Sequence, residues 1–444
     1  MTAVDELAQI VGQCDRCGAC QAVCPLFECL GKEATVARGK LAILRAFLAG
    51  GLGADPVPVS RALDLCLLCH ACAANCPSKV KAPRAVLLGR AALARSVTPP
   101  RLVRAVDAAL ARPGVLALAG LLMRAYHNAR VYRLLKGTGV LGLVRALVGE
   151  AMDFLPPPGG VPESRSSAVA AGSSGAAGRR MAAGGTARGK VHYFAGCMMK
   201  TLYPHVSRAT ISLLEAAGYQ VEVPPARCCG LPLLAHGQLE EARRLASQNV
   251  AIFRDAEMVV TDCASCGASL KDYGWLLGSD PVWRVQAGEF AGKVRDVSEF
   301  LLGVRTGEAA PAAGRGCQVD GRWSQLRVTY HDPCHLVRGQ KIKAPPRELV
   351  RATGVQFVEM AGADTCCGGG GSFHLVHRDV SQRILERKIR AAEETGAQLL
   401  LTACPGCLMQ LQYGVHRAGI SLRVMHLVEF LLAVEPSLIG AGPG

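Results

Sequence analysis

Residues 14–25 read CDRCGACQAVCP, and residues 66–77 read CLLCHACAANCP. Each stretch has three cysteines separated by two residues, a fourth cysteine after three more residues, and then a proline. In such a run three thiolates bind one [4Fe–4S] cluster, and the fourth cysteine binds the cluster of the other run. The prolines fix φ where the chain leaves each run. Residues 1–95 are therefore predicted to form a helical, ferredoxin-like α+β domain around two [4Fe–4S] clusters.

Because the fourth cysteine of each run binds the cluster of the other run, the ligands of both clusters can be assigned. The first cluster is expected to bind Cys14, Cys17, Cys20 and Cys76, and the second is expected to bind Cys24, Cys66, Cys69 and Cys72. Zinc is the alternative occupant, but zinc sites ordinarily use two separate cysteine pairs. Since each cluster joins two distant stretches of chain, cluster assembly is expected to be coupled to folding.

The number of cysteines is informative about the cell compartment of the protein and about the chemistry of its cysteines. The chain has 20 cysteines in 444 residues, which indicates either disulfides in a secreted protein or metal and redox work in a reducing one. The start, MTAVDELAQI, has no basic segment followed by an apolar one, as a secretory signal would. We therefore expect a cytoplasmic protein. Two cysteines lie outside the motifs. We expect Cys29 to be a small buried apolar residue and Cys317 to be incidental.

Charge is concentrated in one part of the chain. The formal net charge is +15, and residues 81–190 contribute 17 basic and 4 acidic side chains. A basic helical region at 96–155 and a flexible linker at 156–190, rich in Gly, Ala, Ser and Pro, are predicted here. The apolar run at 115–123 is shorter than the roughly 20 residues of a membrane span. Three alternatives stay open for this basic region: it contacts the inner face of the membrane, it contacts an acidic partner, or it faces solvent alone. No nucleic-acid motif is present.

The part of the chain that follows the linker is an internal repeat. The first copy (191–305) has the strand-like run VHYFAGC, then CCG, then MVVTDCASC; the second (325–435) has VTYHDPC, CCG and LLLTACPGC. Equivalent cysteines are 137, 138 and 141 residues apart. Alternating strands and helices predict duplicated α/β domains with parallel sheets. Ligands bind at the carboxyl edge of such sheets, so five cysteines per copy should converge there.

This pattern resembles the cysteine-rich CCG domain of the heterodisulfide reductase family, which holds noncubane [4Fe–4S] clusters. The resemblance implies one or two further clusters. Their ligands would be Cys197, Cys228, Cys229, Cys263 and Cys266 in the first copy, and Cys334, Cys366, Cys367, Cys404 and Cys407 in the second. The complete layout is similar to the iron–sulfur subunit of glycolate oxidase and related 2-hydroxyacid dehydrogenases, including the stretch Arg38-Gly39-Lys40. Members of that group often lack some CCG cysteines, whereas both motifs here are complete.

Two functions follow from the resemblance. In the first, the chain takes electrons from a partner FAD-dependent dehydrogenase acting on glycolate, D-lactate or a similar acid, and passes them to a quinone or another acceptor. The chain has no dinucleotide-binding fingerprint, so the flavin would lie on the partner. In the second, the chain itself reduces a disulfide at a noncubane cluster, as heterodisulfide reductases do. A third interpretation makes the CCG cysteines of at least one copy structural or zinc-binding.

Four histidines lie near the CCG motifs. His331 and His335 flank Cys334, and His236 and His374 follow the two CCG triplets. Each is expected either to donate a hydrogen bond or relay a proton, or to be a satisfied structural histidine; none is assigned as catalytic. The glycines at 368–371 are expected to let the backbone approach a cluster.

Overall fold

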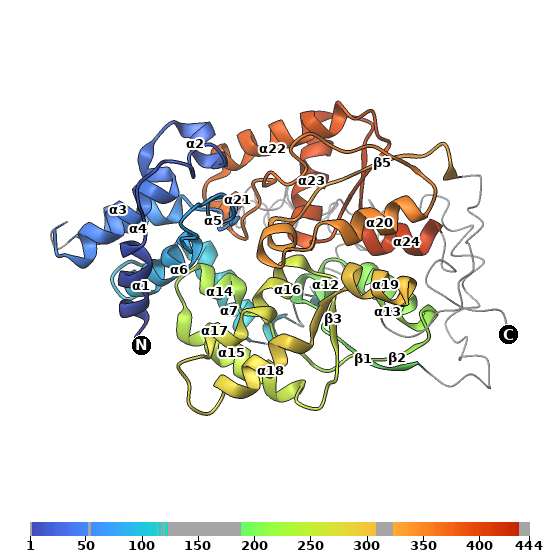
Figure 1. Ribbon diagram of the computed structural model, residues 1–444, viewed down its shortest axis with the longest axis horizontal. Coiled ribbons are helices and arrows are strands. Elements are labelled where there is room, and N and C mark those ends of the chain that lie inside the picture. Colours follow the sequence, from blue (N-terminus) through green and yellow to red (C-terminus); the bar gives the residue numbers. More distant parts are fainter. Residues whose placement is uncertain are drawn as a thin grey trace, which may run out of the picture.

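The computed structural model describes residues 2–51, 55–112, 114–116, 118, 120–122, 188–307 and 323–434. Figure 1 shows the N-terminal helices at one end of the molecule, with the two CCG domains next to each other beyond them. Cys317 and residues 156–187 of the expected linker lie outside the described residues. Residues 189 and 190, also expected in the linker, already belong to the first strand of the first CCG domain.

The described part of the N-terminal domain is helical, and local sequence determines where its helices begin. The Thr2 hydroxyl accepts a hydrogen bond from the Asp5 N–H, and the Asp5 carboxylate accepts one from the Thr2 N–H. Pro25 occupies the first turn of the next helix, where its missing donor costs nothing. Leu7 and Leu44 are fully buried in the shared core. The elements are α1 (Ala3–Gly12), α2 (Pro25–Leu30), η1 (Glu33–Thr35), α3 (Ala37–Leu48), α4 (Val57–Asp64), α5 (Ala71–Ala74), α6 (Ala82–Leu93) and α7 (Arg101–Ala111).

The first CCG domain contains a four-stranded parallel sheet in the order β2-β1-β3-β4. The strands are β1 (Gly189–Tyr193), β2 (Tyr219–Glu222), β3 (Val259–Thr261) and β4 (Val294–Asp296). The helices are α12 (Cys197–Thr201), α13 (Pro204–Ala216), α14 (Leu231–Ala235), α15 (Leu239–Ile252), α16 (Ala264–Lys271), α17 (Tyr273–Leu276), α18 (Arg284–Lys293) and α19 (Val297–Thr306). Every residue of β3 is buried, as expected for a parallel strand covered on both faces.

The second CCG domain repeats this topology with the parallel order β6-β5-β7-β8. Its strands are β5 (Arg327–Tyr330), β6 (Gln356–Phe357), β7 (Leu399–Thr402) and β8 (Arg423–His426). Its helices are the π-helical turn η4 (His335–Gly339), α20 (Ala344–Ala352), α21 (Phe373–Val376), α22 (Arg378–Glu393), α23 (Pro405–Ala418) and α24 (Leu427–Val434). The repeated order confirms the predicted duplication of α/β domains.

The two CCG domains contact each other along their carboxyl edges. The Ala264 N–H donates to the Ala403 carbonyl at 3.0 Å, immediately beside a cysteine of each domain. Farther along, His205 of α13 pairs with Glu429 of α24 at 3.2 Å. This arrangement brings the two predicted ligand sets face to face rather than to opposite ends of the molecule.

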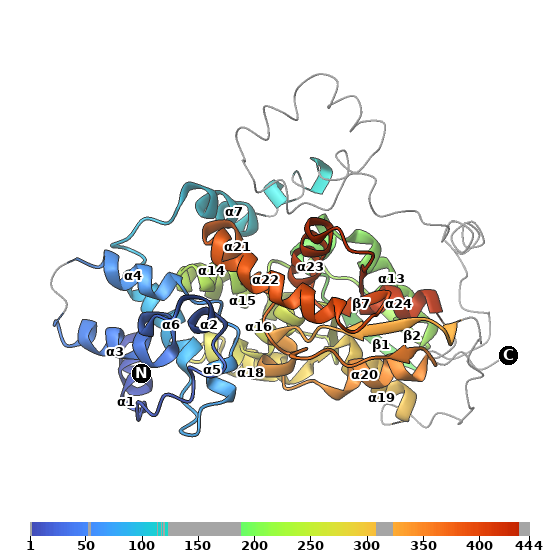
Figure 2. The same ribbon diagram turned by 90° about the horizontal axis from the view of Figure 1, so that it is seen from above.

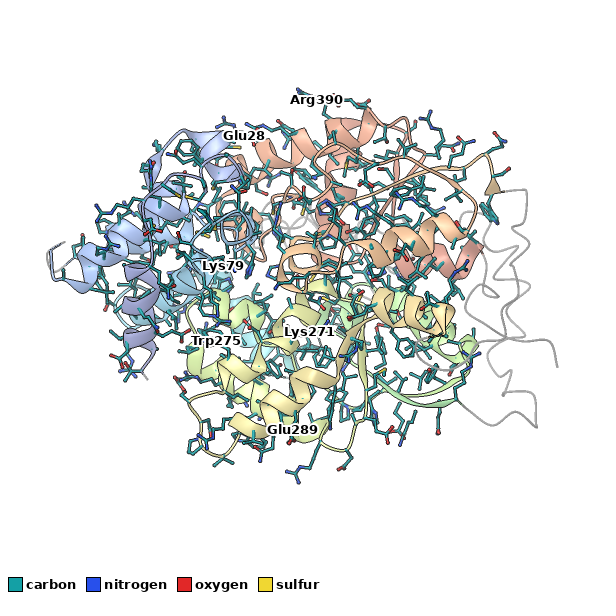
Figure 3. All side chains as sticks on the ribbon, viewed as in Figure 1. Glu28, Lys79, Lys271, Trp275, Glu289 and Arg390 are labelled. Carbon is teal, nitrogen blue, oxygen red and sulfur yellow. The ribbon has the colours of Figure 1, made fainter. Side chains whose placement is uncertain are left out.

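The N-terminal domain packs against both CCG domains. Arg84 of α6 forms an ion pair with Asp272 at 2.9 Å and lies 4.0 Å from the centre of the Trp275 ring. On the other side, Glu28 of α2 pairs with Arg387 of α22 at 2.6 Å. Figure 3 shows Trp275 in the first CCG domain and Glu28 facing the second, with the N-terminal helices between. The cysteine loops of all three domains are therefore held close together.

Helix α7 follows α6, and its Val103 lines a cavity together with Phe373 of α21 and Cys66; Figure 2 shows α7 toward the same side of the molecule as α21. A further helical segment follows, and its described side chains Val115, Leu118, Leu121 and Leu122 are exposed. Among the described residues no single helix is long and apolar enough to span a membrane. One pair, Arg101–Ala111 with Gly114–Leu122, meets the criteria of length and composition only jointly and across a bend of 106°.

Candidate iron–sulfur sites

The first cysteine run forms a small cavity together with the end of the second run. Cys14, Cys17, Cys20 and Cys76 all line it. These are the four cysteines that the motif spacing assigns to the first cluster, although they come from positions up to 62 residues apart in the sequence. Thiol groups on several sides of one cavity are the donor set that a [4Fe–4S] cluster requires, so the residues present fit this group.

A second cavity contains the complementary set. Cys24, Cys66, Cys69 and Cys72 line it, so the fourth cysteine of the first run does reach the second site. Cys72 also lines the first cavity, which makes the two sites immediate neighbours. The ligand assignment itself remains a prediction; the structure places each set of four around one cavity.

The loops that carry these cysteines use unusual backbone conformations. Four non-glycine residues have φ between 53° and 60°, and each lies between or beside the ligating cysteines: Arg16, Leu68, His70 and Lys79. Side chains rarely adopt such angles, and they persist where the surroundings impose them, often at functional sites. The loops thus adopt backbone angles that are locally unfavourable, and these angles place the thiol groups around the cavities.

The Arg38-Gly39-Lys40 stretch serves both cavities. The Arg38 side chain lines the first and donates to the Arg16 carbonyl at 3.3 Å, while Lys40 lines the second. Gly39 lies between them, where an added Cβ would come within 2.0 Å of the Glu33 carbonyl oxygen. Only glycine allows α3 to approach the preceding turn this closely.

Lys40 is a buried cation beside the second thiol set. Its side chain is 1% exposed, and its ammonium donates to the carbonyls of Ala34 and Thr35. Burial lowers the pKa of Lys40, and the nearby Cys66 and Cys24 oppose that shift. A buried cation without a carboxylate partner is costly unless something negative lies close by. A thiolate-ligated cluster, which becomes more negative on reduction, would supply the negative charge that stabilises the Lys40 ammonium.

Lys40→Met should therefore lower the reduction potential of the second N-terminal cluster, by tens of millivolts, because the reduced form loses a buried positive charge close to Cys24 and Cys66. An EPR-monitored redox titration of the anaerobic protein measures this. Lys388→Met is the matched control: Lys388 is equally buried, but it lies beside Cys366 and Cys367 of the second CCG domain. An unchanged potential in Lys40→Met, or the same change in both variants, would contradict the assigned role.

The first CCG set gathers at the carboxyl edge of its sheet. Cys197 follows β1, the adjacent Cys228 and Cys229 follow β2, and Cys263 and Cys266 follow β3. The sheet order switches direction between β1 and β3, which is where open α/β sheets bind ligands. The neighbouring Cys197 and Cys229 raise the pKa of the Cys228 thiol, Cys229 and Cys263 raise that of Cys266, and the Cys266 N–H donates to Cys263 Sγ at 3.3 Å. All five predicted ligands are thus brought together.

The second CCG set has the same arrangement with one additional side chain. Cys367 Sγ lies 3.6 Å from Cys407 Sγ, and the neighbouring Cys334 and Cys367 raise the pKa of the Cys366 thiol. The fully buried His331 has a ring nitrogen within 4.8 Å of the sulfur atoms of Cys367 and Cys407. Neither ring nitrogen of His331 has a nitrogen or oxygen hydrogen-bond partner among the described residues, and His331 adds to the lowering of the pKa of Cys367 by Cys366 and Cys407. His331 is therefore free to donate to cluster sulfur or to act as a ligand.

In the first copy the position equivalent to His331 is Phe194, 137 residues earlier. The two copies therefore differ in polarity next to the thiols, although their cysteines match. The π-helical turn η4 directly after Cys334 is a second difference, since the first copy continues into the α-helix α12. Such turns are frequent at functional sites. The second CCG site is thus the more polar of the two.

The four thiol sets form one contiguous series. The Cys263 thiol of the first CCG domain lowers the pKa of Cys404 of the second, so the two thiols are neighbours, and the Ser265 hydroxyl lies 3.3 Å from Cys404 Sγ. At the other end, the rings of His70 and His335 are 5.5 Å apart, which joins the second ferredoxin loop to the turn after Cys334. Burial lowers the pKa of His70 to about 3, so this imidazole is neutral at physiological pH.

Gly370 makes the contact between the ferredoxin loop and the second CCG loop possible. Its φ is +51°, and an added Cβ would lie 2.7 Å from a methyl group of Leu67. The glycine run at 368–371 therefore also serves the approach of one cysteine loop to another, which the sequence did not indicate.

Sequence reasoning assigned no role to three cations near the thiols: Lys40, which was named only within the Arg38-Gly39-Lys40 stretch, Arg90 and Lys388. Their only sequence signal is a basic residue inside an apolar helical face, which is weak on its own. Cys29 is 6% exposed and packs among Leu26, Leu67 and Phe373, as predicted for a small apolar side chain. Of the other histidines, His374 is buried with its Nδ1 3.2 Å from the Gly369 carbonyl oxygen, and His236 pairs with Asp107 at 2.7 Å.

A helical two-cluster domain followed by two CCG domains defines an iron–sulfur subunit of an oxidoreductase. Family models agree: residues 10–80 match the 4Fe-4S dicluster domain, and residues 191–271 and 328–412 match the Cysteine-rich domain called CCG. The chain is 32% identical to the probable glycolate oxidase iron-sulfur subunit of Bacillus subtilis strain 168, over 94% of this chain and 93% of that protein.

It is also 36% identical to lactate utilization protein A of Geobacillus kaustophilus, over 55% of this chain and 99% of that protein. The lactate utilization protein A of Geobacillus thermodenitrificans is 35% identical over 54% of this chain and 98% of its own length. With a relative that matches nearly end to end, the chain belongs to the family of glycolate oxidase iron–sulfur subunits.

Proposed function

We propose that this chain is the electron-transfer subunit of an FAD-dependent 2-hydroxyacid dehydrogenase. A partner subunit oxidises glycolate, D-lactate or a similar acid, and this chain carries the electrons singly to a quinone. The observation that carries the proposal is the contiguous series of thiol sets, from Cys14 through Cys66 and Cys334 to Cys263. Supporting it, the near full-length relative is named as a glycolate oxidase iron-sulfur subunit.

The chain's own residues would hold and tune the redox groups. The eight N-terminal cysteines would bind two [4Fe–4S] clusters, and the ten CCG cysteines would bind two noncubane [4Fe–4S] clusters, all of which exchange single electrons when bound. Lys40 and Lys388 supply positive charge beside two of the sets. The apolar cores around the CCG cysteines exclude water, which limits solvent exposure of the redox groups and hence influences their potentials.

Localisation at the inner face of the cytoplasmic membrane is part of the proposal. The basic residues at 81–190 would meet anionic lipid headgroups, and the exposed Leu118, Leu121 and Leu122 would enter the interface. A lipid-soluble acceptor would be reached from that side.

The test starts from an affinity-tagged full chain purified anaerobically with whatever it binds. We expect an FAD-containing subunit to co-purify, and glycolate or D-lactate to bleach the visible absorbance of the clusters in the complex but not in the isolated chain. A 3-hydroxy acid is the substrate control, since it lacks the oxidisable carbon next to the carboxylate. Absence of any flavin subunit, or no bleaching by any 2-hydroxy acid, would contradict the proposal.

Disulfide reduction is the second candidate function, favoured by the completeness of both CCG motifs and by the Cys263–Cys404 contact. It would need a bound disulfide to accept two electrons and two protons and leave as two thiols. Reduced viologen as the electron source and a panel of small thiol disulfides would reveal it. Co-purification of a haem membrane subunit alone, together with such turnover, would replace the first function with this one.

A further inference from the structure

A cavity of about 130 Å³ lies where the N-terminal domain, α7 and both CCG domains meet. One wall is apolar and is formed by residues of α6, α7 and α21, including Leu93, Val103 and Phe373, with Pro99 and Pro100 at the turn between α6 and α7. Cys66, a predicted ligand of the second ferredoxin cluster, belongs to the lining as well. The cavity thus has one apolar wall and is also lined by a predicted ligand of a redox centre.

Three polar side chains on one side of the cavity form a hydrogen-bonded series. Asp107 of α7 is 3% exposed, and its carboxylate lies 2.7 Å from His236 Nδ1 and 2.5 Å from the Gln238 amide nitrogen. His236 Nε2 lies 2.5 Å from the Ser372 hydroxyl, and both His236 and Ser372 line the cavity. The series runs from a buried carboxylate to a hydroxyl at the cavity wall, which suits the delivery of a proton.

A second polar group lines the cavity at the opposite end of the short helix α21 from Ser372. His377, at the end of α21, also belongs to the lining. Its Nε2 is buried and has no hydrogen-bond partner among the described residues. A buried ring nitrogen without a partner costs free energy unless a ligand or water completes it.

The guanidinium of Arg90 adds a buried positive charge. It donates to the carbonyls of Ala235 and Leu63 at 2.7 Å and to the Cys66 carbonyl at 3.0 Å. Its nearest carboxylate, Asp64, is 3.9 Å away, and its Nε has no hydrogen-bond partner among the described residues. A cation so placed stabilises negative charge that develops on an oxygen in the cavity.

We propose that this cavity binds the head group of a quinone and is where the chain delivers its electrons. This deepens the proposed function, on which it rests. A quinone has a flat apolar body and two carbonyl oxygens, which suit the apolar wall and the two separate polar groups at Ser372 and His377. Helix α7, which supplies Asp107 and Val103, leads directly to the segment with exposed Leu118 and Leu121, the side from which a lipid-soluble ligand would enter.

The reaction balances with the partner's oxidation. A 2-hydroxy acid loses two electrons and two protons to become a 2-oxo acid, and the quinone gains two electrons and two protons to become a quinol. Both quinone C=O groups become C–O–H groups. The Ser372 hydroxyl would donate one proton to a quinone oxygen and recover one from protonated His236, which Asp107 holds in place and solvent then reprotonates; the other proton comes from solvent on the side of His377.

The same order of carboxylate, imidazole and hydroxyl occurs in serine hydrolases. Here the Arg90 guanidinium and the Cys66 backbone occupy the wall of the cavity, next to a predicted redox centre. The guanidinium would serve either reaction, whereas a neighbouring redox centre is needed only for electron transfer, and the test below separates the two reactions.

Binding is measured first, on the anaerobic holoprotein, by isothermal titration with decylubiquinone and with menadione. Val103→Trp should fill the cavity and weaken binding at least tenfold, and His236→Gln and Ser372→Ala should each weaken it several-fold through a lost hydrogen bond. Val282→Trp, at an exposed position, is the control and should bind as the wild type does. Iron content and circular dichroism verify that each variant is folded and loaded.

Two further measurements distinguish failure of this site from failure of the proposed function. With the partner and a 2-hydroxy acid present, the variants should still reduce ferricyanide while quinone reduction falls. Normal quinone reduction in Val103→Trp, no quinone binding by the wild type, or hydrolysis of p-nitrophenyl acetate that disappears in Ser372→Ala would overturn the cavity assignment. Loss of ferricyanide reduction in the wild-type complex would instead overturn the proposed function and leave the binding result standing.

Discussion

Cys24→Ser and Cys66→Ser are expected to remove the same [4Fe–4S] cluster, although they belong to different motifs. Both cysteines line the second N-terminal cavity, whereas Cys14 and Cys76 line the first. Each substitution should reduce the iron content by about four per chain and abolish one of the two cubane EPR signals. Because each cluster ties the two halves of the domain together, we also expect lower resistance to thermal unfolding.

Cys14→Ser and Cys76→Ser form the matched pair and should remove the other signal. Cys29→Ser is the control, since this buried cysteine lies outside both sets and should leave the iron content unchanged. EPR spectra of the five anaerobic variants, with iron analysis, decide the assignment. If Cys24→Ser removed the same signal as Cys14→Ser, the crossing of the fourth ligands would be wrong.

Arg347→Met is expected to destabilise the second CCG domain by about 3–5 kcal/mol, because it leaves a buried carboxylate without its counter-ion. Asp332 is 1% exposed, and Arg347 contacts its two oxygens at 2.7 and 2.8 Å. The guanidinium also bonds Glu359 at 2.6 Å, and the hydrogen bonds to Glu359 and Asp332 raise the pKa of Arg347. Asp332 lies in the loop that carries Cys334, so the second CCG cluster should be lost before the others.

The first copy provides the control for this prediction. Positions 195 and 210, equivalent to 332 and 347, are alanine and threonine there. The double variant Asp332→Ala/Arg347→Thr removes both charges and should recover much of the lost stability, since no buried charge remains unpaired. Chemical denaturation of the anaerobic protein measures the free energy of unfolding. A double variant as unstable as Arg347→Met would show that packing of the arginine, rather than charge, accounts for the loss.

Cysteine spacing predicted the fold class and the grouping of thiols because iron–sulfur ligation imposes strict local geometry. The CCG repeat, with strand-like runs before each cysteine, likewise predicted two α/β domains with ligands at the carboxyl edges. These features depend on short stretches of sequence. The start of β1 at Gly189 was placed two residues too late, since Gly189 and Lys190 resemble the linker in composition but pair in register with β2.

The relations between domains could not be predicted from the sequence. Nothing in the motifs indicates that Cys263 and Cys404 meet, or that the loop of Cys69 and His70 packs against the turn after Cys334. These contacts depend on ion pairs and close approaches between distant residues, such as Arg84 with Asp272 and Gly370 with Leu67. The cavity with Asp107, His236 and Ser372 was missed for the same reason, since its three side chains come from three different domains or regions.

Iron and acid-labile sulfide, measured together on the anaerobically purified full chain, test the central claim most directly. Four [4Fe–4S] clusters along one series of thiol sets predict about 16 irons and about 16 sulfides per chain. About eight of each, with only two cubane signals by EPR, would show that the CCG cysteines hold no clusters and would contradict the account.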